Sequence, residues 1–290
     1  QCYSSAASDV YKRQIVIGNL FIGGCSLERH VNNIRKDASA YDYRKIGLDG
    51  KKVHHKNMSI SNALAEEEWD YVSLQQASSL SGVYQTYETF LPELYGYVKE
   101  RVGKHCKILF HQTWAYAQNC RNSGFKKYGS NQMGMYRSIV ETVKKAGKLV
   151  KFYRVVPSGT AIQNARTSFI GDYMNRDGSH LDIGVGRYTA ACTWFEVLTG
   201  KSVLGNAFIP KNISSEYAEI AQRAAHEAVR HPDKVTDLSD IKDRSLYKNP
   251  AFSIDRRVDD LLARMNLEEK IYQLNQYTFC LLYTSDAADE

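Results

Sequence analysis

The chain has 290 residues, of which 43% are hydrophobic, and a mean hydropathy of −0.45. These values are typical of a globular protein, and no apolar run approaches the roughly 20 residues that a membrane-spanning helix needs. The formal net charge is +6, but Lys and Arg are scattered and do not alternate with aromatic residues, so binding to nucleic acid is not expected.

The two ends of the chain differ from the rest in composition. Residues 1–14 (QCYSSAASDVYKRQ) and 280–290 (CLLYTSDAADE) lack apolar periodicity, and both resemble translated read-through of sequencing adapters. We interpret both as non-native segments and leave them out of the reasoning about the fold. The genuine sequence is then expected to cover residues 15–279 and to be cut at both ends.

Strand-like apolar runs alternate with amphipathic stretches after residue 14. Ile15–Phe21 is predicted to be a strand, and Ser26 is predicted to cap a helix that ends near Lys36. The turn signal Leu48-Asp49-Gly50 predicts a hairpin between strands at 41–46 and 52–56. Further strands are expected at 70–75, 107–111 and 149–156, and further helices at 86–102, 132–146 and 187–198. This alternation predicts an α/β fold around a mostly parallel sheet.

The sequence changes character near its C-terminal end. Residues 239–254 carry Pro250, many charges and few apolar residues, which is typical of a linker. Residues 255–276 are predicted to form one amphipathic helix, with Val258, Leu261, Leu262 and Met265 along its apolar stripe.

Four predicted strands end in polar sequence. These ends are the turn at 23–26, then 73-SLQQASSLSG-82, 111-HQTWAY-116 and 157-PSGTAIQNAR-166. Because sites in parallel α/β sheets form at the carboxyl ends of strands, we expect one shared pocket. His111 and Trp114 are candidates for the pocket wall, although a strand-end histidine and a core tryptophan are equally good interpretations.

The segment 175-NRDGSHLD-182 places Asp177 three residues before His180. A carboxylate at this spacing can bind one imidazole nitrogen and leave the other to face a nucleophile, which is the arrangement of a general base. Asp and His also occur at this spacing in ordinary loops.

No metal and no cofactor are expected. The six cysteines show no C-x-x-C pair or regular spacing, and the other histidines lack metal-ligand spacing. The glycines Gly23-Gly24 and Gly184-x-Gly186 lack the rest of a nucleotide-binding fingerprint.

Taken together, these motifs resemble a bacterial branch of the SGNH-type (GDSL-like) esterases that is often catalogued only as a domain of unknown function. The motifs are the Gly-Gly-Cys-Ser turn, Ser-Leu-Gln-Gln, His-Gln-Thr-Trp-Ala-Tyr and the Asp177/His180 pair, and the resemblance covers residues 15–238. It implies a flavodoxin-like three-layer α/β/α sandwich, with Asp177 and His180 as catalytic residues. Gly24 and Gln76 would then supply oxyanion donors. The family usually has Asn where Gln76 stands, so Gln75 and Ser78 are alternative candidates for this oxyanion donor.

The nucleophilic serine of this family follows the first strand. Gly18-Asn19-Leu20-Phe21 imitates that turn with Leu20 in the serine's place, but in this branch the second strand reads much like 17-IGNLFIGGCSLERH-30. The resemblance therefore implies that the serine strand precedes residue 15, and that this fragment by itself is inactive and lacks its first strand. A degenerate first strand in an inactive homologue is the alternative, and Ser26 as a substitute nucleophile is disfavoured because serine is a common helix cap.

Residues 255–279 resemble the opening of family 3 glycoside hydrolases of the β-glucosidase or β-xylosidase type, through 257-RVDDLLARMNLEEKI-271. Together the resemblances imply a serine esterase that removes acetyl or related acyl groups from plant polysaccharides, linked to a glycosidase. The partners would be an acylated polysaccharide and that glycosidase domain, and the location would be periplasmic or extracellular. The alternative function is a non-catalytic carbohydrate-binding module that serves the glycosidase.

Overall fold

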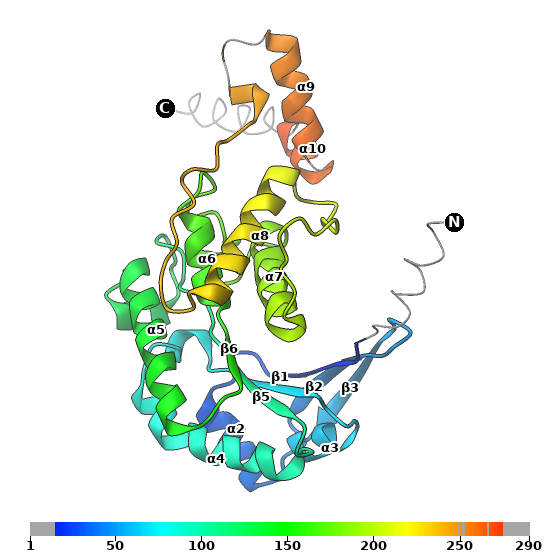
Figure 1. Ribbon diagram of the computed structural model, residues 1–290, viewed down its shortest axis with the longest axis vertical. Coiled ribbons are helices and arrows are strands. Elements are labelled where there is room, and N and C mark those ends of the chain that lie inside the picture. The colour runs from blue at the N-terminus through cyan, green and yellow to red at the C-terminus, as the bar shows by residue number, and fades with distance from the viewer. Residues whose placement is uncertain (1–14, 249, 251–252, 266, 275–290) are drawn as a thin grey trace, which may run out of the picture.

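The computed structural model describes residues 15–248, 250, 253–265 and 267–274. The segments interpreted above as non-native, 1–14 and 280–290, lie outside these residues. Figure 1 shows a body of strands and helices, from which the C-terminal helices α9 (Ile254–Arg264) and α10 (Leu267–Leu274) project at one end.

The body contains a parallel sheet and an antiparallel sheet. The parallel sheet has the order β4-β5-β6, formed by Tyr71–Leu74, Lys107–His111 and Arg154–Val156. The antiparallel sheet has the order β1-β2-β3, formed by Ile17–Phe21, Tyr41–Ile46 and Lys52–Met58. The mixed α/β class is therefore confirmed. The expectation of one mostly parallel sheet is corrected, because β1, the strand predicted at Ile15–Phe21, pairs antiparallel with β2, with Ile17 opposite Ile46.

Helices cover both faces of the parallel sheet, as the alternation of side chains along β5 requires. Ile108 and Phe110 join the larger core, which is built mainly with α2 (Leu27–Arg35), α4 (Gln85–Arg101) and α5 (Gln132–Leu149). Leu109 points the other way and packs with Val156 and Val197, the latter from α7 (Val185–Thr199). Figure 1 shows α4 and α7 on opposite sides of these strands.

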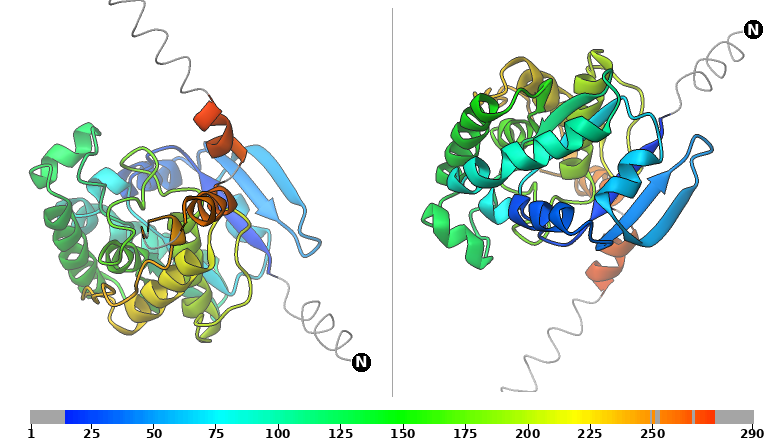
Figure 2. Two further views of the ribbon diagram at one scale, coloured as in Figure 1. Left: turned by 90° about the horizontal axis from the view of Figure 1, so that it is seen from above. Right: turned by 90° about the horizontal axis from the view of Figure 1, so that it is seen from below.

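A second core is built almost entirely from helices and loops. It lies between α7, α6 (Ser158–Arg166) and α8 (Ser215–Arg230), where alanines such as Ala221, Ala224 and Ala225 are completely buried. Small side chains let these helices pack closely. The hairpin of β2 and β3, followed by α3 (Ile60–Ala65), extends from the side of the body in both views of Figure 2.

Several predicted boundaries are confirmed by the structure. The strand β5 matches 107–111, the hairpin forms where its turn signal stands, and the Ser26 side chain accepts a hydrogen bond from the Arg29 backbone N–H as the cap of α2. The predicted strand at 149–156 is reduced to Arg154–Val156, because α5 continues as far as Leu149.

The predicted single helix at 255–276 is wrong. The structure has α9 and α10 instead, with the extended backbone of Met265 ending α9. The next residue, Asn266, is a weak helix former. Glu268 and Glu269 then stand in the first turn of α10, where acidic side chains favour a new helix start.

Candidate active site

A tight hairpin carries Asp177 and His180. Asp177 Oδ2 lies 2.7 Å from His180 Nδ1, while Asp177 Oδ1 accepts backbone hydrogen bonds from Ser179 (3.0 Å) and His180 (2.7 Å). These bonds, led by the one from the His180 backbone N–H, hold the pKa of the Asp177 carboxyl well below its usual range. The carboxylate is therefore ionised at neutral pH and fixes the orientation of the imidazole.

The other side of the His180 ring is open. Its side chain is 68% exposed, and Nε2 has no hydrogen-bond partner within the described residues. An imidazole held through Nδ1, with Nε2 free and accessible, is the arrangement that a general base needs. The structure thus brings together the two residues that the sequence paired.

The hairpin is anchored from the loop that follows β5. Trp114 Nε1 donates to the Ser179 carbonyl at 2.9 Å, and the Ala117 backbone N–H donates to the Gly178 carbonyl at 2.8 Å. Gly178 has φ +81°, and a Cβ there would stand 2.8 Å from Cys120 Cα. Glycine is required at this position for both its dihedral angle and the close approach of the two backbones.

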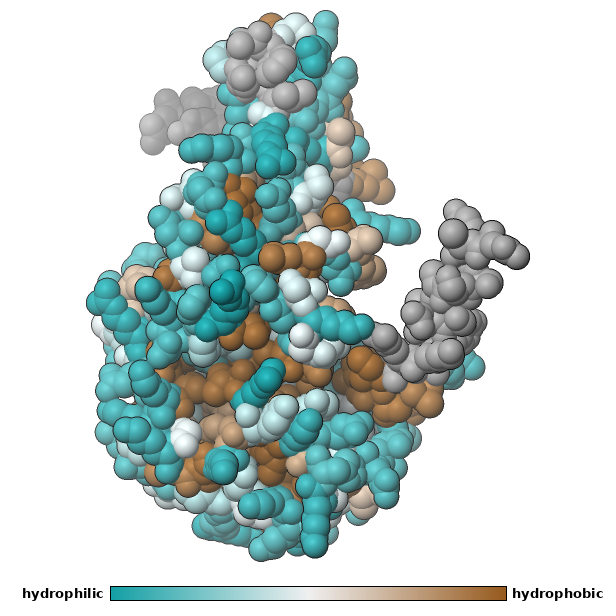
Figure 3. Space-filling model, viewed as in Figure 1, coloured by the Kyte–Doolittle hydropathy of each residue, from teal (hydrophilic) through white to brown (hydrophobic). Residues whose placement is uncertain are grey.

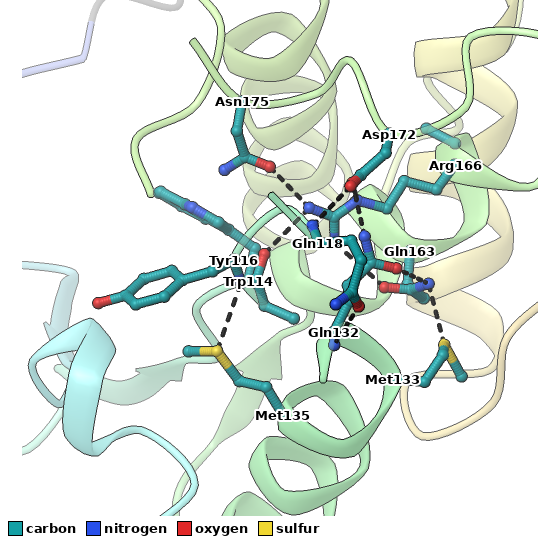
Figure 4. A network of polar contacts seen from close by, with 12 residues as sticks. Trp114, Tyr116, Gln118, Gln132, Met133, Met135, Gln163, Arg166, Asp172 and Asn175 are labelled. Carbon is teal, nitrogen blue, oxygen red and sulfur yellow. Dashed lines mark hydrogen bonds and ion pairs between the residues drawn. The ribbon is translucent and has the colours of Figure 1, made fainter. Parts of the chain in front are cut away.

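Arg166 supports the same hairpin from below (Figure 4). Its guanidinium Nη2 donates to the Asn175 side chain at 2.6 Å and to the Ala115 carbonyl at 3.1 Å, and Asn175 in turn donates to the Ser179 carbonyl. Arg166 Nε lies 2.9 Å from Asp172 Oδ1, as an ion pair without hydrogen-bond alignment.

Burial lowers the pKa of Arg166 to about 10, which leaves it cationic at neutral pH. The Asp172 carboxylate that compensates this charge also accepts from the Gln118 backbone N–H and the Gln132 amide. The cluster therefore fixes α6, the loop after β5 and the Asp177 hairpin relative to one another. This cluster was not predicted from the sequence, because the polar composition of 157–166 is typical of a loop. In the structure these residues form α6, and all nine residues of the helix are buried.

His111 is buried at the carboxyl end of β5, within a polar chain that runs from exposed Gln75 to buried Ser158. Its Nδ1 lies 2.9 Å from Gln75 Oε1 and its Nε2 lies 2.9 Å from Ser158 Oγ. Burial lowers the pKa of His111 to about 4, so the ring is neutral at pH 7. With Gln75 Oε1 accepting, Nδ1 carries the proton and Nε2 accepts from the Ser158 hydroxyl. Ser158 is fully buried, so this chain is a structural connection between three strand ends.

The rings of Trp114 and Trp194 flank His111, with centroids 6.4 Å and 5.1 Å away. Trp114 therefore lies between His111 and the Asp177 hairpin. Three of the four polar strand ends meet as expected, since Gln75, His111 and Ser158 each follow or end a strand of the parallel sheet.

Gln76 has a different set of contacts from the one predicted. Its Oε1 accepts from the backbone N–H of Leu27 (3.0 Å) and of Ala77 (2.8 Å), and its Nε2 donates to Thr86 Oγ1 at 2.9 Å. With 1% of its surface exposed, this amide ties the end of β4 to the first turn of α2. These contacts are those of a structural amide at the end of a strand, whose hydrogen bonds are nearly all made within the protein. Only one N–H of Nε2 is left that could donate to an oxyanion.

Gly24 lies in the turn just before α2, exposed and with φ +62°. No hydrogen bond joins Gly24 or Gln76 directly to the Asp177 hairpin within the part of the chain that the structure describes. Leu20 packs against the larger core, which suits a strand residue rather than a lost nucleophile.

Among the described residues, no three His, Cys, Asp or Glu side chains gather closely enough to hold a metal ion. None of the described helices has the length and apolar character needed to cross a bilayer. The prediction that the protein needs no metal or cofactor stays a prediction.

The profile of a family described as "Domain of unknown function (DUF4886)" matches residues 3–228. The chain belongs to the DUF4886 family. A crystal structure of a DUF4886 family protein from Bacteroides uniformis ATCC 8492 is 57% identical, with a TM-score of 0.79, and the match covers 81% of this chain and 90% of that chain. No curated protein matches the sequence. The DUF4886 range contains the Asp177 hairpin, His111 and Gln76, and it ends before α9 begins.

Proposed function

We propose that this DUF4886 domain is the Asp–His part of a serine esterase of the SGNH type, which removes acetyl or related acyl groups from plant polysaccharides. The observation that carries the proposal is the Asp177–His180 pair, with a 2.7 Å contact to Nδ1 and an accessible Nε2. The nucleophilic serine is proposed to stand on a strand that precedes residue 15.

The arrangement of the sheets supports a place for such a strand. β1 and β4 are both edge strands, and each pairs on one side only among the strands described. Ile15 and Ile17 are 59% and 50% exposed beside this open edge of β1. Figure 3 shows apolar side chains gathered in the lower half of the view, where Figure 1 draws β1 and β6. A strand inserted between β1 and β4 would join the two sheets and give the flavodoxin-like sandwich that the resemblance implies.

In the proposed reaction, the serine hydroxyl attacks the ester carbonyl while His180 Nε2 accepts its proton. The imidazolium then gives this proton to the sugar oxygen as its bond to the acyl carbon breaks, and water repeats the sequence on the acyl-enzyme to release the acid and restore the serine. Asp177 stays ionised throughout and stabilises the imidazolium through Nδ1. The Gly24 backbone N–H and the remaining N–H of Gln76 are the proposed oxyanion donors.

The C-terminal helices suit a further domain. Val258, Leu261 and Leu262 of α9 are 45%, 39% and 45% exposed, so the apolar stripe of this helix lacks a full covering among the described residues. We propose that α9 and α10 begin a family 3 glycosidase linked to the esterase. The linkage would keep deacylated sugar near the second active site, in an exported protein.

The test uses a longer chain, in which the native residues that precede Ile15 in the source gene replace residues 1–14. Acetate release from acetylated xylan is measured for that chain, for His180→Gln and Asp177→Asn, and for His105→Gln as an exposed control histidine. We expect losses of about 10³-fold or more for the two hairpin variants and none for the control. Covalent labelling by a fluorophosphonate should require the serine.

Unchanged hydrolysis in His180→Gln would overturn the proposal. So would a native sequence before Ile15 that has no serine at the end of a strand, combined with tight glycan binding and no turnover, a result that would assign the domain to carbohydrate binding instead.

A further inference from the structure

Six exposed cations gather at one end of the parallel sheet. Because β5 and β6 are parallel, their amino ends share an edge, and the helices α4 and α5 that precede them run back to the same edge. The last turns of these helices, the connections that follow and the first residues of the strands supply Arg101, which pairs with Glu100, and six exposed cations without such a pair among the described residues: Lys99, Lys104, Lys107, Lys148, Lys151 and Arg154. We call these six residues the cation patch.

Aromatic rings lie between these cations. Lys107 Nζ is 4.6 Å from the centroid of the Tyr153 ring and 5.6 Å from that of Tyr71, and Arg154 Cζ is 5.5 Å from Tyr153. Lys99 Nζ lies 5.9 Å from the Tyr95 ring, whose hydroxyl donates to the Lys151 carbonyl at 2.8 Å. Cation–π contacts and this hydrogen bond therefore join the two halves of the patch into one surface.

The patch is not neutralised by the protein. None of its six cations has a carboxylate within ion-pair distance in the described part of the chain. Nearest along the chain are Glu100, which lies 3.8 Å from Arg101 outside the patch, and Glu141, which pairs with Lys145 at 2.7 Å. Asp70 lies beside the patch, because its carbonyl accepts from the Lys107 backbone N–H at 2.8 Å. Six like charges with so little compensation repel one another unless an anionic partner binds.

We infer that the cation patch binds an acidic polysaccharide through the carboxylates of its uronic acid residues. Five of the six cations are lysines, and each lysine ammonium is a compact point charge that can pair with a single carboxylate of a polymer without the bidentate geometry that arginine provides. Lys107 covers the Tyr71 and Tyr153 rings, which leaves less of their faces for the base stacking that single-stranded nucleic acid uses. Only Lys99 and Lys148 of the patch lie on helices, in the last turns of α4 and α5, and the other four follow in connections and strand starts, so the patch does not present the length of a helix to a duplex groove.

The patch and the candidate active site lie at opposite ends of β5. Lys107 is the first residue of this five-residue strand and His111 the last, a separation of about 13 Å along the strand. A polymer is long enough to occupy both ends at once. The patch would then hold the polysaccharide while its acyl groups reach the candidate active site at the other end of β5. This raises the effective concentration of the acyl groups there, although the patch does not contact the reacting atoms.

Binding of polygalacturonate oligomers to the 290-residue chain tests the inference without any ester cleavage. The variant carries Lys107→Glu and Lys151→Glu, and the control carries Lys126→Glu and Lys127→Glu, which make the same charge change on exposed lysines elsewhere. We expect binding to weaken about tenfold or more in the variant, to change less than about twofold in the control, and to weaken with added salt. Circular dichroism checks that both remain folded, and Tyr153→Leu should weaken binding with all charges kept.

Methyl-esterified polygalacturonate should not bind, because it has lost its carboxylates. Equal binding of the esterified polymer, or equal weakening in the two double variants, would overturn the inference. Tighter binding of single-stranded RNA or of anionic vesicles than of polygalacturonate would also overturn it and assign the patch to that partner. A binding result of either sign leaves the esterase proposal standing, because His180 is not involved.

Discussion

The buried neutral His111 ring makes the stability of the protein depend on pH. In the unfolded chain its pKa is about 6.5, and in the folded protein burial lowers it to about 4. Between pH 4 and pH 6.5 the imidazole is therefore mostly protonated in the unfolded state and mostly neutral in the folded state. The stabilising contribution is therefore complete above the unfolded pKa and is lost as the pH falls toward 4.

The size of the effect follows from the two pKa values. They differ by about 2.5, and each pKa unit corresponds to about 1.4 kcal/mol, so full titration costs about 3 kcal/mol. Between pH 7 and pH 4.5 the linkage relation gives a loss of about 2 kcal/mol. His111→Gln removes this titration, and the glutamine amide retains hydrogen-bonding groups toward Gln75 and Ser158.

The assay is urea unfolding of the wild type and of His111→Gln at pH 4.5, 5.5, 6.5 and 7.5. We expect the variant to be less stable at pH 7.5 and the gap between the two proteins to shrink by about 2 kcal/mol at pH 4.5. His30, whose pKa burial also lowers to about 4, is present in both proteins and cancels in the difference. A constant gap across this range would refute the reasoning, and exposed His105→Gln should run parallel to the wild type.

Three further substitutions test the support of the Asp177 hairpin. Gly178→Ala should lower the free energy of unfolding in urea by about 3 kcal/mol, and the control Gly205→Ala by about 1 kcal/mol. Both glycines have positive φ, but only a Cβ at residue 178 would collide with Cys120, so equal losses would rule out that contact. Arg166→Met should cost about 3 kcal/mol in the same assay, since it leaves buried polar partners without their cation; a loss below about 1 kcal/mol would contradict the network. Trp114→Phe keeps an aromatic ring but loses the indole N–H that bonds to Ser179, and should cost about 1 kcal/mol together with most of any esterase activity in the longer chain. Full activity would show that the hairpin keeps its shape without this bond.

Local sequence signals predicted the elements whose ends they mark. Ser26 capped α2 as expected because a serine side chain can satisfy a free backbone N–H, and the turn at 48–50 joined its hairpin. The Asp177–His180 contact was also predictable, since both partners lie within one tight turn and need no distant element to meet.

Features that depend on tertiary packing were not predictable in the same way. The small and polar residues of α6 give no amphipathic pattern, because every face of that helix is buried. The contacts of Gln76 with α2, and of Arg166 with residues on two other segments, join positions far apart in the chain. The cation patch was likewise missed, because its two halves lie about 45 residues apart along the chain and meet only through the sheet.

The antiparallel sheet has two edges of very different chemistry. The outer strand β3 exposes Lys52, His54, His55 and Lys56, whose charge and polarity discourage another chain from pairing there. The opposite edge, β1, exposes Ile17 and Phe21 and carries no charged residue, although Arg44 covers the Phe21 ring. Intermolecular β-pairing of this chain should therefore start at β1, which is a template for aggregation at high concentration, while the β3 edge stays protected.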